Sequence, residues 1–323
     1  MKRRTFMTAM AAMGAQAAAF ESRAAGFPER PITLIVPYAA GGNGDYTARA
    51  FGESLARVLK QPIVVENRAG GGGAIGASYV ANAKADGYTL IVAAKGVFSI
   101  TPNIVKVNYT IDDFMPVSFV SETPMVLEVR KNSPIKSLAD LVAKAKEKPG
   151  ALSAGIGAIG SDNHVAQLQF ELATGTSFNS VAYKGAAPML LDLLGGQIDV
   201  GVDQLTTSKS HIEAGELRPL AVLGLHPEPS LPSVPTIASI GAQPFDATTY
   251  IGVLAPRGTP GPAVAVLKKA MRQALQDPGL NERFAKSGGA VYVGEDGQFE
   301  KLVQAESDFI QRMIAQGKVK KEG

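Results

Sequence analysis

Short runs of apolar residues alternate along the chain with longer segments in which apolar side chains recur every three or four positions. The first pattern is typical of buried strands and the second of amphipathic helices. The runs that we expect to be strands are residues 32–36, 63–65, 88–93, 152–154, 178–183, 200–203, 217–223 and 251–254. The segments that we expect to be helical are 45–60, 74–84, 137–146, 163–173, 187–194, 262–276 and 297–315. Strands that alternate with helices predict an α/β protein.

The first three expected strands are joined by the first two expected helices. Crossover connections of this kind are right-handed and place the strands they join side by side and parallel. The N-terminal third of the chain therefore predicts a parallel β-α-β-α-β unit. The chain of 323 residues is long enough for two domains, each with a core of its own.

Residues 1–26 have the pattern of a signal peptide. Lys2, Arg3 and Arg4 precede an apolar stretch of about 11 residues at positions 9–19, and small residues follow. The run from Arg3 to Met7 resembles a twin-arginine signal, and export by the general secretory route stays an alternative. We expect a periplasmic protein, and no later stretch reaches the 18 apolar residues of a membrane-spanning helix.

Removal of this segment changes the charge of the protein. It holds four basic side chains and one acidic one, so the remaining chain has 28 basic and 28 acidic side chains. A neutral chain gives no reason to expect nucleic acid or anionic lipid as a partner. The absence of cysteine excludes disulfides, thiolate catalysis and cysteine-ligated metals.

The segment from Pro37 to Asp45 is the strongest candidate for a binding site. An expected strand ends, three glycines turn the chain, and an expected helix begins. Free backbone N–H groups and the helix dipole would then point at one place, which favours an anion. The alternative is a tight turn without a ligand.

A second glycine loop, from Gly155 to Gly160, matches the G-x-G-x-x-G pattern of dinucleotide sites and follows an expected strand. The acidic residue that such a site needs about 20 positions later is missing, and the next helix starts beyond the last glycine. A second anion-binding turn fits better, with His164 either donating to a ligand or bonded to its own loop.

No enzyme motif or metal site stands out. The three histidines are far apart and lack metal-ligand spacing, so we expect no metal and no cofactor. Asp45, Asp199 and Asp203 could be catalytic carboxylates. The pattern favours a structural interpretation, in which Asp45 caps its helix and Asp199 and Asp203 flank a strand near the cleft.

An ordered set of motifs resembles the Bug family, the substrate-binding receptors of tripartite tricarboxylate transporters. The resemblance covers essentially all of residues 27–320, and the set as a whole carries it. Besides the two glycine loops it includes Val65-Glu-Asn-Arg68, Asp86-Gly-Tyr-Thr-Leu90, Tyr183-Lys-Gly185, Asp192-Leu-Leu-Gly-Gly-Gln197 and Leu231-Pro-Ser-Val-Pro-Thr236.

The resemblance implies an α/β, two-lobed type II periplasmic-binding-protein fold with a ligand cleft between the lobes. It places residues 27–124 and 246–323 in lobe 1 and residues 125–245 in lobe 2. It implies that loops of both lobes hold a ligand carboxylate. The expected ligand-binding residues are Tyr38, Ala39, Gly42, Asn43 and Asp45 in the first loop, Gly157, Ser161 and His164 in the facing loop, and Tyr183 and Asp203 on the far wall.

Lys95 departs from the family, which usually carries Ser or Thr at this position. It should lie just past the carboxyl end of the third strand, where open α/β sheets bind ligands. We expect Lys95 either to pair with a second acidic group of the ligand or to be a solvated loop lysine.

These features predict a receptor and not an enzyme. The receptor would capture a small organic carboxylate by hinge closure and deliver this ligand to integral membrane transporter subunits. We expect the receptor to be a monomer. Two alternatives stay open: a periplasmic ligand sensor for a signalling kinase, and an NAD-dependent oxidoreductase that uses Gly155 to Gly160.

Overall fold

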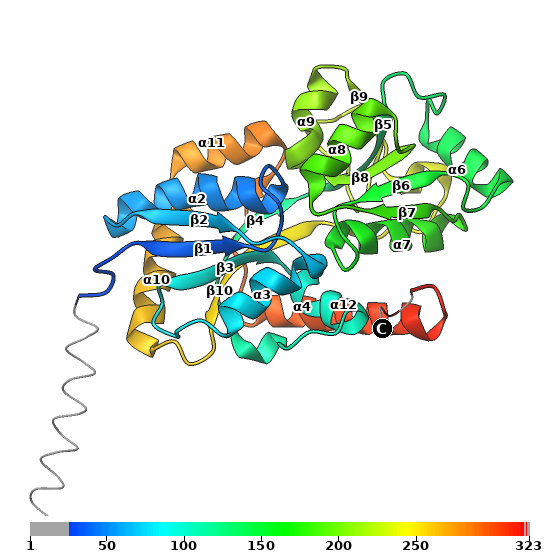
Figure 1. Ribbon diagram of the computed structural model, residues 1–323. Helices are drawn as coiled ribbons and strands as arrows, with labels where there is room; N and C mark the ends of the chain where they lie inside the picture. Colours follow the sequence, from blue (N-terminus) through cyan, green and yellow to red (C-terminus); the bar gives the residue numbers. More distant parts are fainter. Residues whose placement is uncertain (1–25, 320, 322–323) are drawn as a thin grey trace, which may run out of the picture.

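The structure is a computed structural model that describes residues 26–319 and residue 321. The chain forms two lobes, each built around its own β-sheet, which lie side by side in Figure 1. The expected signal peptide, apart from Gly26, lies outside the described residues. The two-lobed α/β fold expected from the sequence is confirmed.

The sheet of lobe 1 has the strand order β11-β4-β10-β3-β1-β2. Strand β1 is parallel to β2 and to β3, as the crossover pattern predicts, whereas β10 runs antiparallel to β3 and β4. The strands are β1 (Ile32–Val36), β2 (Ile63–Asn67), β3 (Thr89–Ala94), β4 (Phe114–Thr123), β10 (Thr249–Pro256) and β11 (Ala290–Val291).

Helices cover both faces of this sheet. Phe51 and Leu55 of the first helix, α2, pack with Leu34 of β1 and with Leu267 and Met271 of α10 in one buried cluster. Truncation of a fully buried Phe such as Phe51 would cost about 3–5 kcal/mol. The helices are α2 (Asn43–Leu59), α3 (Ala74–Ala81), α4 (Gly96–Ser99), α5 (Thr101–Ile104), α10 (Gly261–Ala274) and α11 (Pro278–Ser287), with short 3-10 turns η1 (Gly71–Gly73) and η2 (Ile111–Asp113).

The sheet of lobe 2 has the order β7-β6-β8-β5-β9, with β6 parallel to β7 and β8 and with β5 antiparallel to β8 and β9. Its strands are β5 (Met125–Arg130), β6 (Ser153–Ile156), β7 (Asn179–Ala182), β8 (Val200–Gln204) and β9 (Leu217–Val222). Its helices are α6 (Leu138–Glu147), α7 (Asp162–Thr174), α8 (Ala186–Gly195) and α9 (Leu205–Glu213), with a 3-10 turn η3 (Ile237–Ile240).

The chain passes between the two sheets twice. Pro124 alone separates β4 from β5, and the second passage lies between the end of β9 and the start of β10. Residues far apart in the sequence therefore form each lobe, and two narrow connections join the lobes.

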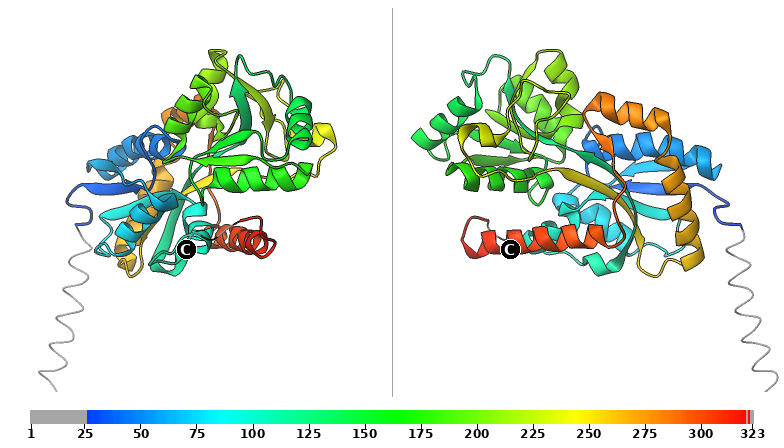
Figure 2. Two further views of the ribbon diagram at one scale, coloured as in Figure 1. Left: turned by 45° about the vertical axis from the view of Figure 1, so that its right-hand side comes forward. Right: turned by 180° about the vertical axis from the view of Figure 1, so that it is seen from behind.

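The C-terminal helix, α12 (Gln298–Ala315), runs along one side of both lobes, as the red helix of Figures 1 and 2 shows. Its residues Ile310 and Met313 pack with Ile104 of lobe 1 and with Val165 and Leu168 of α7 in lobe 2. This apolar cluster ties α12 to both lobes. Among the described residues, no helix has the length and apolarity needed to cross a membrane.

The longer elements without a counterpart among those expected from the sequence are β4, β5, α9 and α11; the short elements α4, α5 and β11 were not expected either. Pro116 lies inside β4 and Pro124 follows it, which breaks the apolar pattern of a strand. The pairing of β4 with β10 is irregular between Val253 and Leu254, opposite Pro116, which has no N–H to donate. Helix α2 starts at Asn43, two residues before the expected start.

Candidate functional site

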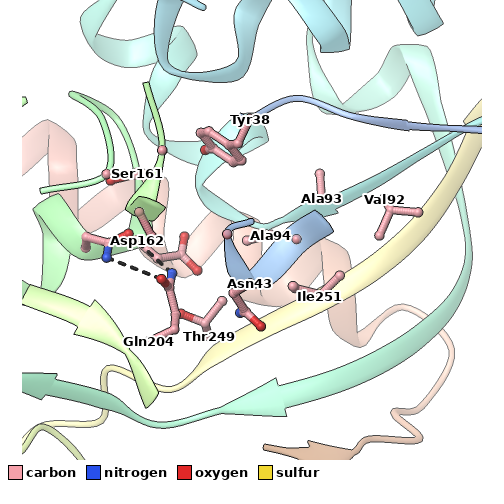
Figure 3. A pocket seen from close by; sticks show the side chains of 16 residues that line it. Tyr38, Asn43, Val92, Ala93, Ala94, Ser161, Asp162, Gln204, Thr249 and Ile251 are labelled. Carbon is pink, nitrogen blue, oxygen red and sulfur yellow. Dashed lines mark hydrogen bonds between the residues drawn. The ribbon is translucent and has the colours of Figure 1, made fainter. Parts of the chain in front are cut away.

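A narrow cavity of about 50 Å³ lies between the two lobes. The carboxyl ends of parallel strands meet there, which is where open α/β sheets bind ligands. Figure 3 shows its lining. Lobe 1 contributes Tyr38, Gly42, Asn43, Gly44, Val92, Ala93, Ala94, Thr249 and Ile251, and lobe 2 contributes Gly157, Ser161, Asp162, Asn163, Gly185, Ala186 and Gln204.

The N-terminus of α2 points into this cavity. Gly42 is the N-cap residue and makes no side-chain capping bond, and Asn43 and Gly44, the first helical residues, line the cavity. The first N–H groups of a helix have no partner within it and carry the positive end of its dipole. This end of α2 can therefore hold an anion.

The N-terminus of α8 faces it from lobe 2. Gly185 is an N-cap without a side chain, and its φ of 142° is a conformation that favours glycine. The N–H groups of Ala186 and Ala187 follow, and Pro188 has none to donate.

The two helix starts lie close together. A Cβ atom added at Gly42 or at Gly157 would lie 3.8 Å from the backbone nitrogen of Ala186. Ala39 donates its N–H across the cleft to the carbonyl of Lys184 at 3.1 Å. Glycine at positions 42 and 157 thus keeps open a space that N–H groups of both lobes surround.

The N-terminus of α7 is already capped by its own loop. The hydroxyl group of Ser161 accepts the N–H of His164 at 3.4 Å and donates to the carbonyl of Ala158 at 2.7 Å. Ser161 lines the cavity, but its hydroxyl proton is bonded within the loop.

Two buried polar atoms of the lining, Asn43 Nδ2 and Thr249 Oγ1, have no hydrogen-bond partner, and Asp162 Oδ2 makes no hydrogen bond but lies 3.6 Å from the ammonium group of Lys95. Asn163 and Gln204, by contrast, bond each other in both directions at 3.2 and 3.3 Å. Buried polar groups normally have partners, so unpaired atoms around a cavity indicate a ligand.

The wall formed by β3 and β10 is apolar. It consists of Val92, Ala93, Ala94 and Ile251, all with small or aliphatic side chains. In Figure 3 these side chains and Asn43 lie on one side of the space and Asp162 on the other. This wall therefore offers mainly carbon surface to a ligand.

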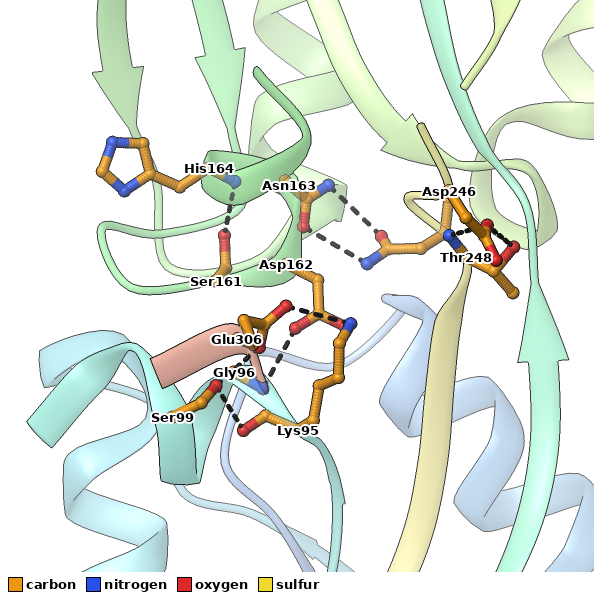
Figure 4. A network of polar contacts seen from close by, with 11 residues as sticks. Lys95, Gly96, Ser99, Ser161, Asp162, Asn163, His164, Asp246, Thr248 and Glu306 are labelled. Atoms are coloured by element: carbon orange, nitrogen blue, oxygen red, sulfur yellow. Dashed lines mark hydrogen bonds and ion pairs between the residues drawn. The ribbon is translucent and has the colours of Figure 1, made fainter. Parts of the chain in front are cut away.

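Lys95 does not line this cavity. Its ammonium group lies 3.0 Å from Glu306 Oε1 of α12 and 3.6 Å from Asp162 Oδ2 of α7, as Figure 4 shows. Burial lowers the pKa of Lys95, but the charges of Asp162 and Glu306 outweigh this effect and raise it. The side chain is only 13% exposed, so the expectation of a solvated lysine is wrong.

This cluster crosses between the lobes. The N–H of Gly96 donates to Asp162 Oδ1 at 3.0 Å, and the hydroxyl of Ser99 donates to Glu306 Oε2 at 2.5 Å. Lys95, Gly96 and Ser99 belong to lobe 1, Asp162 belongs to lobe 2, and Glu306 belongs to α12. We call these five residues the Lys95 cluster.

Five other residues expected at the site also lie outside the cavity lining: Ala39, Asp45, His164, Tyr183 and Asp203. Asp45 accepts the N–H of Gly41 at 3.0 Å and bonds Arg49 Nε at 3.0 Å. Burial alone would raise the pKa of Asp45, but these bonds lower it. Asp45 therefore stabilises the glycine loop from behind.

His164 was expected either to donate to a ligand or to bond its own loop, and in the structure it bonds its own loop. Its Nδ1 accepts the N–H of Gly160 at 3.5 Å, and Figure 4 shows the imidazole turned away from the Lys95 cluster. Burial lowers the pKa of His164 to about 4, so the ring is neutral at pH 7.

Tyr183 and Asp203 are likewise engaged within lobe 2. The phenol of Tyr183 donates to Asp192 Oδ2 at 2.7 Å. Asp203 is fully buried in β8 and accepts the hydroxyl of Thr207. Burial raises the pKa of Asp203 and, together with the charge of Asp203, that of Glu128.

The structure thus brings together Tyr38, Gly42, Asn43, Gly157 and Ser161 from the expected set. Gly185 was missed, although a strand, a glycine and a helix start occur there as at Gly42. Thr249 and Ile251 could not be found, because the sequence does not show that β10 is antiparallel. Within the described residues, no group of acidic and histidine side chains could hold a metal ion.

Comparisons with known proteins give consistent matches. A family model described as tripartite tricarboxylate transporter family receptor matches residues 47–318. Protein BugT of Bordetella pertussis is 36% identical over 292 residues, which are 88% of this chain and 88% of BugT.

Solved structures agree. The periplasmic binding protein BugD superposes with a TM-score of 0.86 at 33% identity, over 92% of this chain and all of that one. The R. palustris protein Rpa4515, solved with adipate, superposes with a TM-score of 0.85 at 35% identity, over 91% of this chain and 99% of that one.

Proposed function

The chain belongs to the Bug family of tripartite tricarboxylate transporter receptors, and from this premise we propose that it captures a small organic carboxylate in the periplasm. The bound acid would be delivered to integral membrane subunits of a transporter of this type. The family is one of substrate-binding receptors. We propose that this chain accordingly has no enzymatic activity and acts as a monomer.

One observation carries the proposal: the N-termini of α2 and α8 meet across the cavity. Gly42 and Gly185 leave both helix starts without side-chain caps, so their N–H groups are available to a ligand. Two helix dipoles that converge on one space stabilise negative charge there. A carboxylate is the small organic anion that fits these donors, and the similar protein Rpa4515 was solved with adipate.

The proposed ligand contacts are the residues that were expected at the site from the sequence and that also line the cavity. They are Tyr38, Gly42, Asn43, Gly157 and Ser161. To these we add Gly185 and Ala186, whose backbone groups complete the site from lobe 2.

Hinge closure would trap the ligand. The two passages between the sheets support a division into residues 27–124 with 246–323 and residues 125–245. Thr206 of α9 donates its hydroxyl to Asn43 Oδ1 at 2.8 Å, and the N–H of Ala39 reaches Lys184. Both bonds join the two lobes, so opening the cleft would break them and expose the cavity.

The test is a thermal-shift screen of the chain expressed with its own leader and purified from the periplasmic fraction. The panel contains mono-, di- and tricarboxylates, amino acids, aromatic acids, sugars and NAD. A ligand at 100 times its Kd stabilises the folded protein by about 2.7 kcal/mol, which raises Tm by several degrees.

We expect a shift with one class of acid and none with sugars or NAD. A shift with NAD alone would favour the dinucleotide alternative at Gly155–Gly160. If no acid raises Tm and calorimetry detects no binding of any acid, the receptor proposal fails.

A further inference from the structure

The Lys95 cluster joins the two lobes beside the ligand cavity. Asp162 lines that cavity, whereas Lys95, Gly96, Ser99 and Glu306 do not. On the premise of the proposed function, we propose that Lys95 and Gly96 form a latch for the carboxylate of Asp162. The latch stabilises the closed lobes and so sets how tightly and for how long a ligand is held, without touching the ligand.

Asp162 forms the wall between two spaces. It lines the ligand cavity, and with Lys95 and Glu306 it also lines a second space of about 180 Å³ on the side of α12. Its side chain is only 3% exposed. Because Asp162 is the first residue of α7 in lobe 2, movement of lobe 2 away from lobe 1 would draw its carboxylate out of the latch.

Lobe 1 contacts both oxygens of this carboxylate, as Figure 4 shows. Gly96 donates its N–H to Asp162 Oδ1 at 3.0 Å, and the ammonium group of Lys95 lies 3.6 Å from Oδ2. Contacts with a charged group are stronger in a buried site than at the surface, where water screens them. Both contacts require closed lobes, so they favour the closed form over the open one.

The latch can open without leaving a buried charge alone. Glu306 Oε1 lies 3.0 Å from the ammonium group of Lys95, and the hydroxyl of Ser99 donates to Glu306 Oε2 at 2.5 Å. Helix α12 shares a buried apolar cluster with α4, so Glu306 stays beside Lys95 when lobe 2 moves. Asp162 would then be hydrated. A buried charge without a partner is strongly unfavourable, and neither form of the cluster contains one.

A latch outside the cavity has a specific effect on binding. The apparent Kd of every ligand rises by the same factor when the closed form becomes less favourable. The residues of the cavity lining, in contrast, decide which acid binds best. Loss of the latch should therefore weaken all acids equally, leave their order unchanged, and act mainly through faster dissociation.

Gly96→Ala tests the latch without removing a charge. Gly96 begins α4, where alanine is well tolerated, but its Cβ atom would lie 2.6 Å from Asp162 Oδ1 in the closed form. We expect Gly96→Ala, and likewise Lys95→Met, to raise the Kd at least about tenfold. Gly261→Ala is the matched control, because nothing lies within 4 Å of a Cβ atom there.

The Kd and the dissociation rate are measured for the two acids of the thermal-shift panel that raise Tm most. Calorimetry gives the Kd, and displacement of the bound, radiolabelled acid by unlabelled acid gives the rate. The double variant of Gly96→Ala with Lys95→Met should lose little more than the weaker single variant, because both changes release the same carboxylate.

The ligand-free protein gives a second readout. The chain has no cysteine, so Lys144→Cys on lobe 2 and Lys269→Cys on lobe 1, both at exposed positions, take one spin label each. Pulsed electron paramagnetic resonance should show that a fraction of the otherwise wild-type molecules is closed without any acid. Gly96→Ala should remove this fraction, and Gly261→Ala should keep it.

The proposal is overturned if folded Gly96→Ala and Lys95→Met proteins bind both acids within about twofold of the wild type, or if they reverse the order of the acids. It is also overturned if Gly96→Ala leaves the label distances of the ligand-free protein unchanged. If the wild type binds no acid, the receptor proposal fails, and the label distances still decide whether the latch exists.

Discussion

Gly42 is the residue at which the anion site is most sensitive to added volume. Its φ of −86° is accessible to alanine, and a Cβ atom there would lie 3.8 Å from the nitrogen of Ala186. Gly42→Ala should therefore fold, at a cost of at most about 1 kcal/mol for the poorer N-cap. The new methyl group would occupy the space that the ligand carboxylate needs.

We expect Gly42→Ala to reduce affinity for the acid at least tenfold in calorimetry. Gly195→Ala is the control, because nothing lies within 4 Å of a Cβ atom at that glycine. Unchanged affinity in Gly42→Ala would mean that the carboxylate lies elsewhere in the cavity.

Asp203 should make the protein less stable at high pH. Burial is the main cause that raises the pKa of Asp203 to about 7, and Glu128 is buried beside it. Between about pH 4 and pH 7 the folded form keeps a proton that the unfolded form releases, so the free energy of unfolding falls as the pH rises. Above pH 7 the loss is complete.

Asp203→Asn removes this dependence. Denaturant unfolding at pH 5 and pH 8 should show a gain over wild type at pH 8 that exceeds the gain at pH 5 by at least about 1 kcal/mol. Asp112→Asn, which is exposed, should show no such difference. An equal effect of Asp203→Asn at both pH values would contradict a raised pKa.

Among the elements, α12 contacts both lobes outside the cavity. It supplies Glu306 to the Lys95 cluster and Ile310 to the apolar cluster that includes α7. Lys95→Met would leave two carboxylates buried without their cation, and loss of one partner of a buried ion pair costs about 3–5 kcal/mol.

We expect Lys95→Met to lower the free energy of unfolding by about 3 kcal/mol. The double variant Lys95→Met with Glu306→Gln should lose less, since glutamine leaves no unpaired charge at that position. Lys301 is an exposed lysine of α12, the helix that carries Glu306, and Lys301→Met serves as the control. A double variant that is less stable than Lys95→Met alone would contradict the pairing.

The strands and helices also show which parts of the fold could be predicted from the sequence. The pattern of apolar residues located β1, α2, β2, α3 and β3, because glycine, proline or a turn bounds these elements. It missed β4 and β5, where Pro116 and Pro124 interrupt the pattern, and it could not show that β10 is antiparallel.

Some residues of the candidate site could likewise be predicted from the sequence and others could not. The glycine loops at Gly42 and Gly157 were found because strand, glycine and helix start are contiguous in the sequence. Thr249 was missed as a cavity residue, because it reaches the cavity only through the packing of β10 against β3. Asp162 was missed although it directly follows Ser161 in the expected loop. Lys95 was correctly placed at the end of β3, but its partner Glu306 lies 211 positions further along the chain.

At the scale of the whole molecule, the proposed function depends on closure of the two lobes. The bonds from Ala39 to Lys184 and from Thr206 to Asn43 exist only when the lobes are in contact. Small-angle scattering should therefore show a smaller radius of gyration with a saturating acid than without it. An acid that gives no thermal shift is the control, and an unchanged radius with a bound ligand would contradict hinge closure.

N–H groups of α2 and α8 are proposed to hold a carboxylate between the lobes. The most direct measurement compares, by calorimetry, the acid found in the screen with its primary amide. The amide keeps the size of the ligand and removes its charge, so we expect a loss of affinity of at least about 100-fold, or about 2.7 kcal/mol. Binding of the amide within threefold of the acid would show that the site does not recognise a carboxylate.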